Sequence, residues 1–414
     1  MKIVLFTAGT ADDVAPFLAL AMGLQRLGHR IVLSAPEFYR RTIEQNRVAA
    51  QLLYGNVQDI FFTEPGNRWL AAGEKPLWGQ MRMLIGRIRH HMQAEILDVC
   101  RDGDALIFHP SFRFEASVVS EALRKPILFA SPTPAIAVTG NRVNLPLLAA
   151  LRHKSEAAEL NDLRSLFGLG PLRDSLRQQL ERQRIPVLHA YSPMFASGTG
   201  GRGNHHFVSG VVRYAGFSLP PADGQQPDEE MDAWLDRGPA PIYFGLDGFP
   251  VADPRKLIDI VISLTKQLQV RAVIASGWAD WIVRDYRLPD SIKVKRSFNL
   301  DRLFPRCSCA VHHGGAGATL AALETGTPSV ICSSDAEQRF WGERIEAHRV
   351  GSHIPLHRLT LNKLKIAVRK LQQESIKPHV SELGDKLKRE NGLQAALEWL
   401  ETMLPIAPVY RNET

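Results

Sequence analysis

The sequence predicts an α/β protein of two doubly wound domains, each with a parallel sheet covered by helices on both faces. Three observations carry this prediction. The chain has 414 residues, more than a single domain usually contains. Short apolar runs alternate with amphipathic stretches along most of the chain, a pattern typical of parallel sheets. A stretch rich in Pro, Gly and Asp near residue 220 separates two such series.

The first fifty residues show the strand–helix–strand pattern clearly. Residues 2–7 form a short apolar run suited to a buried parallel strand. Apolar residues then recur at helical spacing over residues 17–27, with Pro16 expected in the first turn and Gly28 after the end. Residues 30–34 form the second apolar run, so this segment predicts a β-α-β unit.

The same signals continue through both halves of the chain. In the first half, strands are expected at residues 105–108 and 126–129, with a helix at 115–123 between them. In the second half, strands are expected at 242–245, 272–275, 292–294, 309–312 and 329–332, and helices at 254–268, 316–324 and 393–404. Ligands of such open sheets lie beyond the carboxyl ends of the strands, so we expect a cleft there.

These patterns divide the chain into four parts. Residues 1–215 are the first Rossmann-like domain, residues 216–238 are a linker, and residues 239–385 are the second Rossmann-like domain. Residues 386–414 contain a final helix after a charged stretch.

The composition is that of a globular protein and excludes disorder as the main state. Hydrophobic residues make up 45% of the chain and charged residues 22%. Four cysteines lack regular spacing, and the pair Cys307 and Cys309 is not a zinc pattern, so a reduced compartment is expected. No signal peptide and no apolar run of about 18 residues is present, which favours a cytoplasmic protein.

The net charge of +7 leaves three kinds of partner to consider: nucleic acid, an anionic membrane surface and an anionic substrate. No aromatic-basic motif supports nucleic acid. Residues 81–91 alternate bulky apolar and basic side chains, which suits peripheral contact with the inner face of a membrane. A half-buried helix with a solvated basic face explains the same pattern.

The strongest motif is the run HHGGAGAT at residues 312–319, placed between an expected strand and an expected helix. Glycines there let backbone N–H groups approach a diphosphate, and the helix adds its positive amino-terminal end. A histidine ring and the Thr319 hydroxyl can also donate hydrogen bonds. The alternative is a tight strand–helix turn with packing glycines and no ligand.

This run, followed by GTP at 326–328 and AEQRFWG at 336–342, resembles the donor-site signature of the glycopeptide and macrolide glycosyltransferases and the sterol glucosyltransferases. The resemblance extends over nearly the whole chain. It implies the two-domain GT-B fold, with a final helix that packs back toward the first domain. It also implies inverting sugar transfer from a nucleotide sugar, with no metal and no further cofactor.

The resemblance assigns the donor site residue by residue. His313 and the glycines of the turn (Gly314, Gly315 and Gly317) hold the diphosphate, aided by Thr319, and Glu337 with Gln338 holds sugar hydroxyls. Ser276, Trp278 and Phe298 fall in the region that binds the base. Either aromatic ring would stack on uracil or belong to the core.

Four positions in the second half of the chain depart from the pattern of that family. Glu337 replaces the usual Asp and would alter the choice of sugar, and Ala318 replaces a Thr. Asp247 and Gly248 replace a Gly-Ser turn, which puts an acid near the expected diphosphate and leaves the donor pose there open.

In the first domain, the run GTADDVAPF at residues 9–17 resembles the Gly-Thr-x-Gly-Asp-Val-x-Pro loop of the family. The match makes Asp13 the catalytic base, which takes the proton of the acceptor hydroxyl. It places Thr10 among the donor-binding residues, and Asp12 where the family has glycine. Asp13 as a helix N-cap is the alternative. His109, after the strand at 105–108, is either a second residue of the site or a structural histidine.

Two further motifs are discounted. Asp102-Gly103-Asp104 has the form of a metal-binding Asp-x-Asp, but it precedes its strand and is expected to be a turn. The run GTGGRG at residues 198–203 has the spacing of a dinucleotide fingerprint, but no amphipathic helix follows it, so a loop is expected.

Taken together, the sequence predicts transfer of a hexose, with glucose as the default, from a UDP- or dTDP-sugar to a hydroxyl of a small lipophilic acceptor. A catalytically degenerate homologue that stabilises another enzyme is the competing hypothesis, and Asp12 and Asp247 are the features that favour it. A sugar epimerase or hydrolase of the same fold is a third.

Overall fold

The structure is a computed structural model. It describes residues 1–9, 11–53, 95–132, 156–173, 176–195, 205–207, 228–245, 254–277, 283, 285–334, 336–373 and 376–405. Several residues singled out from the sequence therefore lie outside the described residues: Thr10, residues 81–91, residues 198–203, Asp247, Gly248 and Trp278.

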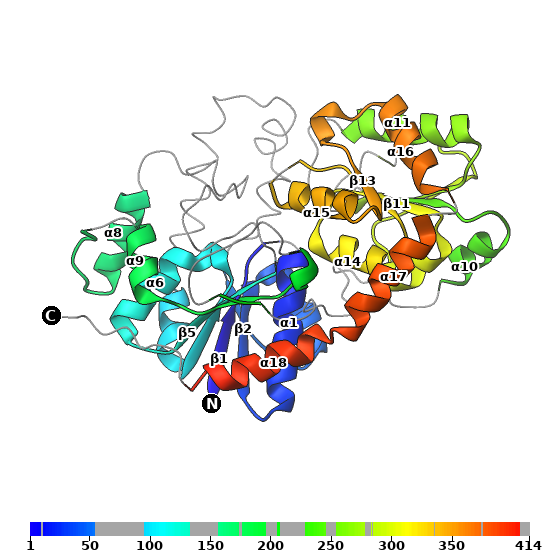
Figure 1. The fold of residues 1–414 in the computed structure, drawn as a ribbon. Helices are drawn as coiled ribbons and strands as arrows, with labels where there is room; N and C mark the ends of the chain where they lie inside the picture. The colour runs from blue at the N-terminus through cyan, green and yellow to red at the C-terminus, as the bar shows by residue number, and fades with distance from the viewer. Residues whose placement is uncertain are drawn as a thin grey trace. The chain divides into compact units, whose positions relative to one another are not determined.

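The described residues form two compact units, each built on one parallel sheet (Figure 1). The first unit contains the described residues up to Tyr214 together with those from Glu390 onward. The second contains the described residues of Ala215–Arg389. The predicted fold class, with two Rossmann-like sheets, is confirmed.

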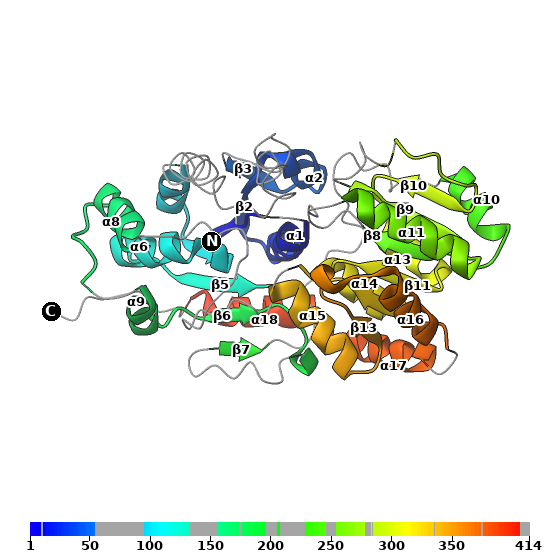
Figure 2. The same cartoon turned by 90° about the horizontal axis from the view of Figure 1, so that it is seen from above.

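The sheet of the first unit has seven strands in the order β3-β2-β1-β4-β5-β6-β7 (Figure 2). Chain order reverses between β1 and β4, so the carboxyl ends of these two neighbours form the switch point at which open sheets bind ligands. All pairs are parallel, and Ile3 of β1 lies between Ile31 of β2 and Ala105 of β4. The strands are β1 Lys2–Phe6, β2 Arg30–Pro36, β3 Ala49–Leu53, β4 Ala105–Phe108, β5 Ile127–Ser131, β6 Val187–His189 and β7 His205–Phe207.

Helices connect these strands. Ala116 and Val119 of α6 pack on one face of the sheet, in a core cluster with Val4 and Phe108. The helices of the first unit are α1 Ala11–Arg26, α2 Arg40–Gln45, α6 Arg113–Leu123, α8 Glu156–Leu166, α9 Leu176–Gln183 and α18 Gly392–Met403, with short 3-10 turns η1 Glu37–Tyr39, η3 Pro110–Phe112 and η4 Pro193–Phe195.

Helix α1 begins earlier than the sequence suggests. The expectation that Pro16 stands in the first turn is wrong, because the helix starts at Ala11 and Pro16 is buried inside it. Proline has no N–H to give to the carbonyl four residues back, so a helix normally avoids it there. The Thr7 hydroxyl, after β1, donates to the Asp13 carbonyl oxygen at 2.9 Å and ties the first turn of α1 to the end of that strand.

Helix α18 packs on α1 within the first unit (Figure 1). Gly23 of α1 leaves the room that the Leu397 side chain fills, since a Cβ there would lie 2.6 Å from a Leu397 methyl group. His29 Nε2 lies 2.5 Å from Glu401 Oε1, and Ser192 Oγ donates to Glu390 Oε1 at 2.8 Å. The last described segment of the chain is thus bound by apolar packing and by two polar side-chain contacts.

The second unit has six parallel strands in the order β10-β9-β8-β11-β12-β13 (Figure 2). Ile242 packs on the face covered by α11 and α16, whereas its neighbour Tyr243 packs on the face covered by α10 and α14. The strands are β8 Ile242–Gly245, β9 Ala272–Ala275, β10 Ile292–Lys295, β11 Cys309–His312, β12 Ser329–Ile331 and β13 Gly351–His353. The helices are α10 Glu229–Asp236, α11 Pro254–Leu268, α13 Leu300–Leu303, α14 Ala316–Glu324, α15 Ala336–Ala347, α16 Leu361–Leu371 and α17 Ile376–Arg389.

Part of the expected linker is folded. Residues 228–238 include α10, whose Met231 and Leu235 are buried against the second sheet. The Asp228 side chain accepts a hydrogen bond from the Met231 N–H at 3.1 Å and caps the helix. The assignment of residues 229–236 to a linker is therefore wrong.

Two other features noted in the sequence, the Asp-x-Asp run and the four cysteines, belong to the fold of the chain. Asp102 ends a helical stretch, and Gly103 and Asp104 connect it to β4. Asp104 Oδ2 accepts a hydrogen bond from the Lys2 N–H at 2.7 Å. All four cysteines are buried and free, and burial raises the pKa of the Cys309 thiol to about 12. Among the described residues, no helix has the length and apolar character needed to cross a membrane.

Candidate active site

Asp13 lies in the first turn of α1, next to the loop that leaves β1. Because α1 begins at Ala11, Asp13 is its third residue, and the alternative that Asp13 is the N-cap is wrong. Gly9 has a φ of +130°, and a Cβ on it would overlap the Asp13 carboxylate. The carboxylate thus occupies space that only a glycine at position 9 leaves open.

His109 follows β4 and brings an imidazole ring to Asp13. Its Nε2 lies 3.5 Å from Asp13 Oδ1, and its side chain is 3% exposed against 20% for Asp13. Burial lowers the pKa of His109 to about 3, so the ring is neutral at ordinary pH. The two candidate residues of the first domain are therefore neighbours at the switch point of the sheet.

Tyr39 is a third member of this group, and sequence analysis missed it. Its side chain is fully buried, and its hydroxyl donates to the Gly9 carbonyl oxygen at 3.5 Å. Burial raises the pKa of Tyr39 well above its usual value, and the negative charges of Asp13 and Asp12 raise it further. No local pattern marks Tyr39, because it lies in the connection after β2 and meets Gly9 only in the fold.

Most of the described donor-site candidates gather at one edge of the second sheet. Ser276 follows β9, His313 follows β11, and Glu337 is the second residue of the helix after β12. These strands are parallel, and β9 and β11 both flank β8, so their carboxyl ends lie along a common edge.

The two histidines of the turn have different environments. His312 is 2% exposed, and its Nδ1 accepts the Gly314 N–H at 3.2 Å, which fixes the turn. Burial, and secondly the neighbouring His313, lowers the pKa of His312 to about 3. His313 is only half-buried. The structure thus gives the first histidine a role in folding and leaves the second more accessible.

The glycines after these histidines allow the chain to turn sharply into α14. Gly314 has a φ of +96°, and a Cβ there would lie 2.5 Å from an Ile331 methyl group and 3.1 Å from the Gln338 carbonyl oxygen. Gly315 is the N-cap of α14 and has no side chain to satisfy the helix N–H groups. Gly317 lies in the first turn of that helix.

The Thr319 hydroxyl is used within α14 itself. Thr319 is fully buried, and its Oγ1 donates to the Gly315 carbonyl oxygen at 2.8 Å. The hydroxyl proton is therefore used inside the turn. Thr319 contributes to a ligand site by shaping that turn.

Gln338 also turns back on its own helix. It is 5% exposed, and its Oε1 accepts both the Ser334 N–H at 2.7 Å and the Ser334 hydroxyl at 2.9 Å. The amide oxygen therefore holds the start of α15, and Glu337, which is half-buried, is the more accessible of the pair.

The two described residues of the base-binding region are held in place by the fold. Ser276 is fully buried, and its N–H donates to the Lys295 carbonyl oxygen at 2.8 Å. The half-buried Phe298 packs beside the core and meets the Tyr243 ring edge to face at 6.5 Å. Phe298 is thus a core residue with one part of its ring uncovered.

Replacing Gly314 by alanine is expected to destabilise the turn and weaken donor binding together. The positive φ costs about 1–3 kcal/mol for a residue with a Cβ. The added methyl group also meets the backbone of Gln338, which cannot move as a side chain would. Calorimetry and titration with a nucleoside diphosphate measure the two effects. Gly170→Ala, which adds a methyl group in open space, is the control and should change neither.

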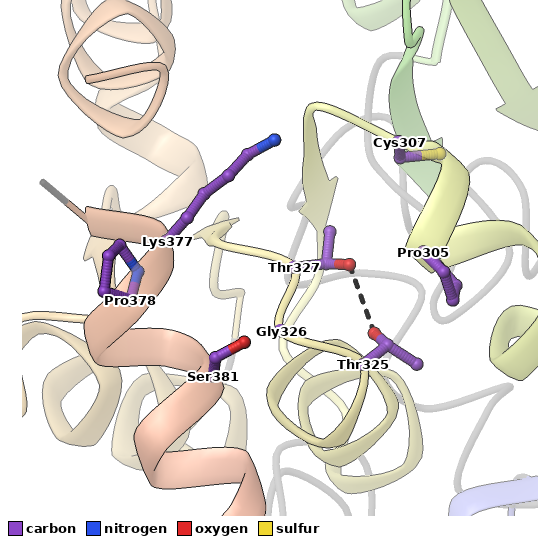
Figure 3. A pocket seen from close by; sticks show the side chains of 8 residues that line it. All are labelled: Pro305, Cys307, Thr325, Gly326, Thr327, Lys377, Pro378 and Ser381. Atoms are coloured by element: carbon purple, nitrogen blue, oxygen red, sulfur yellow. Dashed lines mark hydrogen bonds between the residues drawn. The ribbon is translucent and has the colours of Figure 1, made fainter. Parts of the chain in front are cut away.

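A separate pocket lies at the opposite ends of the strands (Figure 3). It has a volume of about 420 Å³ and lies between α17 and the residues that precede β11 and β12. The Thr327 hydroxyl donates to the Phe304 carbonyl oxygen at 2.8 Å, and the Thr325 hydroxyl donates to the Ala321 carbonyl oxygen at 2.7 Å. These hydroxyls serve the fold. The lining residues are Pro305, Cys307, Thr325, Gly326, Thr327, Lys377, Pro378 and Ser381.

Within the part of the chain that the structure describes, no group of three or more His, Cys, Asp or Glu side chains is arranged to hold a metal ion.

The fold resembles solved glycosyltransferases along the whole chain. The glycotransferase of kitacinnamycin superposes with a TM-score of 0.71 at 15% identity, covering 98% of this chain and 99% of that one. The glycosyltransferase VinC, solved in complex with dTDP, gives 0.67 at 17% identity over 98% and 99% of the two chains. The calicheamicin glycosyltransferase CalG4 gives 0.67 at 17% identity over 99% and 100%. The protein has the GT-B fold.

Sequence relatives refine this class. Residues 280–393 match the family model described as the C-terminal domain of erythromycin biosynthesis protein CIII-like proteins. Two sterol 3-beta-glucosyltransferases of Arabidopsis thaliana are each 29% identical over 98% of this chain, which spans 68% and 66% of their lengths. A sterol 3-beta-glucosyltransferase of Komagataella phaffii is 26% identical over 96% of this chain and 34% of its own length. The protein is a glycosyltransferase related to the sterol glucosyltransferases and the natural-product glycosyltransferases.

Proposed function

We propose that this protein transfers a hexose, with inversion, from a UDP- or dTDP-sugar to a hydroxyl group of a small lipophilic acceptor. The observation that carries the proposal is the turn from His313 to Gly315 at the start of α14. There, the amino-terminal end of α14 has no side-chain cap, and the half-buried imidazole of His313 lies beside it, an arrangement suited to a diphosphate.

The proposed reaction needs one base and one site for the leaving group. As the acceptor oxygen bonds to the anomeric carbon, Asp13 takes the hydroxyl proton, and the bond from that carbon to the diphosphate breaks. Negative charge then grows on the nucleoside diphosphate. The fixed N–H groups of the turn and His313 stabilise that charge most in the transition state. This scheme requires no metal ion.

The relatives support particular substrates. The Arabidopsis proteins are named sterol 3-beta-glucosyltransferases, which favours glucose as the sugar and a sterol-like alcohol as the acceptor. VinC was solved with dTDP, which keeps that nucleotide beside UDP as the donor. The accessible carboxylate of Glu337 is suited to accepting hydrogen bonds from sugar hydroxyls.

Thermal unfolding with UDP, dTDP, GDP and their glucose conjugates tests the donor site first. A ligand at 100 times its dissociation constant stabilises the folded state by about 2.7 kcal/mol and raises the unfolding temperature. We expect a selective rise with UDP or dTDP, followed by transfer of glucose to a sterol in a product assay. Well-folded protein that responds to no nucleotide would contradict the proposal and favour a degenerate partner of another enzyme.

A further inference from the structure

The second unit contains a long stretch of chain without acidic residues. Over the whole protein, 50 Lys and Arg stand against 43 Asp and Glu, but residues 347–373 include no Asp or Glu. The same stretch contains six Lys and Arg residues, Arg349, Arg358, Lys363, Lys365, Arg369 and Lys370. Four of these six lie on α16, so this helix carries most of the uncompensated charge.

Helix α16 buries one side against the sheet and exposes the other. Leu364, Val368 and Leu371 are buried in the core cluster of this unit. Because successive residues of a helix turn by about 100°, Ile366 emerges almost opposite them. Ile366 is 60% exposed, more than any other large apolar residue in the described part of the chain. Its branched Cβ does not favour a helix, and it gains little from packing, so the fold does not require an isoleucine there.

Basic side chains surround Ile366 on the exposed side of α16. Lys363 lies three residues before it, and Arg369 and Lys370 lie three and four residues after it, so all three are its neighbours on the helix surface. These three residues are exposed. The helix contains no carboxylate that could neutralise them. The α16 face is defined as these four exposed side chains, an apolar tip with three cations beside it.

Helix α11 packs beside α16 and widens this positive surface (Figure 1). Lys365 Nζ of α16 donates to Gln267 Oε1 of α11 at 3.0 Å, so its charge meets a neutral amide. The exposed Lys266 precedes Gln267 in the chain. Asp259, the acidic residue of α11, lies about two turns from Lys266 and interacts with Tyr286. The surface is therefore positive over more than one helix.

A lone apolar side chain among cations is a pattern typical of a helix that lies on a membrane surface. Long Lys and Arg side chains reach the lipid phosphates while the apolar tip enters the headgroup layer. We propose that the α16 face binds the surface of an anionic lipid membrane, with Ile366 inserted among the headgroups. Each cation near such a surface strengthens binding about fivefold, so the four on α16 together give a substantial but reversible attraction.

Two other partners fit these observations less well. Single-stranded nucleic acid stacks its bases on aromatic rings, whereas the tip of the α16 face is the aliphatic Ile366. A second copy of the chain bound through the same face would bring the same positive charge against it. An anionic membrane uses both the charge and the apolar tip. It is also where the lipophilic acceptor of the proposed reaction gathers, although the binding of a membrane does not depend on that reaction.

Flotation with lipid vesicles tests the proposal on the full chain. The protein is expected to bind vesicles made of equal parts of phosphatidylcholine and phosphatidylserine, and not to bind vesicles of phosphatidylcholine alone. Raising the salt concentration from about 0.1 M to about 1 M should release it, because the screening length falls from about 10 Å to about 3 Å.

Two variants separate the charge from the apolar tip. The double variant Lys363→Gln, Lys370→Gln is expected to lower the partition coefficient on the mixed vesicles about 25-fold, at about fivefold for each cation. Ile366→Ser should lower it about three- to tenfold, because the partly inserted apolar side chain is lost. All three side chains are exposed, so the unfolding temperature should stay at the wild-type value.

Matched controls change the same residue types elsewhere. The double variant Lys386→Gln, Lys388→Gln removes two positive charges from α17, where Lys386 lies 2.7 Å from Glu382 and Lys388 lies 3.9 Å from Asp385. Leu166→Ser removes an apolar residue that is 48% exposed on α8. Charges and apolar groups away from the membrane contribute little, so both controls should bind the mixed vesicles within about twofold of the wild type.

Three results would overturn the proposal: a wild type that ignores the mixed vesicles, equal binding to neutral vesicles, or a loss in the α17 control as large as that in the α16 variant. Binding of an RNA oligonucleotide without binding of vesicles would assign the face to nucleic acid instead. Thermal unfolding with nucleotides tests the donor site separately. A protein that transfers no sugar but shows the expected vesicle results would refute the proposed function and leave the membrane face standing.

Discussion

Asp13→Asn is expected to lower kcat for sugar transfer by about 10²–10⁴-fold, the usual contribution of a general base. The amide has nearly the same shape as the carboxylate, so the space beside Gly9 and the start of α1 are preserved. It cannot take a proton from the acceptor hydroxyl. The donor contacts proposed for the second unit are unaffected, so the dissociation constant for the nucleotide should change by less than about twofold.

Single-turnover kinetics and calorimetric titration with the nucleoside diphosphate measure these two quantities. Asp12→Asn is the matched control, because Asp12 is the adjacent acid in the same helical turn. Its kcat should stay within about fivefold of the wild type. Near-normal turnover by Asp13→Asn would show that another group is the base, and Asp12 would then be the first residue to examine.

His313→Ala is expected to weaken binding of the nucleoside diphosphate and to lower kcat by about 10²–10³-fold, the usual cost of losing one donor to developing negative charge. The fold should persist, because His312 and Gly314 make the contact that fixes the turn. His357→Ala, which removes an exposed histidine from the 3-10 turn Leu356–Arg358, is the control and should change neither quantity.

Titration of the variant with UDP and dTDP, beside turnover at saturating donor, separates the two effects. A loss of affinity with unchanged kcat would mean that His313 contacts the ground state and the transition state equally. Unchanged affinity and unchanged kcat would remove His313 from the donor site.

The sequence predicts the fold well where one local pattern decides the structure. Parallel strands buried on both faces read as continuous apolar runs, and for this reason β1, β4 and β11 lie where their residues suggest. The early start of α1 is different, because Pro16 suggests a first turn five residues later than the helix begins, and the Thr7 hydroxyl that donates to the Asp13 carbonyl oxygen gives no local pattern. Helix α10 has a short buried side, with Met231 and Leu235 buried and Trp234 partly buried beside them, and so gives a weak pattern in the sequence.

The candidate site likewise has one part that a local motif predicts and other parts that depend on the fold. The turn from His313 to Gly315 is a local motif and was found directly. The contact between His109 and Asp13 joins residues 96 positions apart in the chain, and it follows only from the neighbouring positions of β1 and β4 in the sheet. The Gln338 amide can form hydrogen bonds either with a ligand or with the residues at the start of α15. The residue type alone does not decide between these two possibilities.

The packing of α18 on α1 has a consequence for the order of synthesis. The groove beside Gly23 on α1 is filled by a helix that the ribosome makes only after the whole second unit. At ordinary rates of translation the uncovered apolar surface of α1 persists for about ten seconds or more. The nascent first unit is thus open to chaperones during that interval, and its maturation is tied to completion of the second unit.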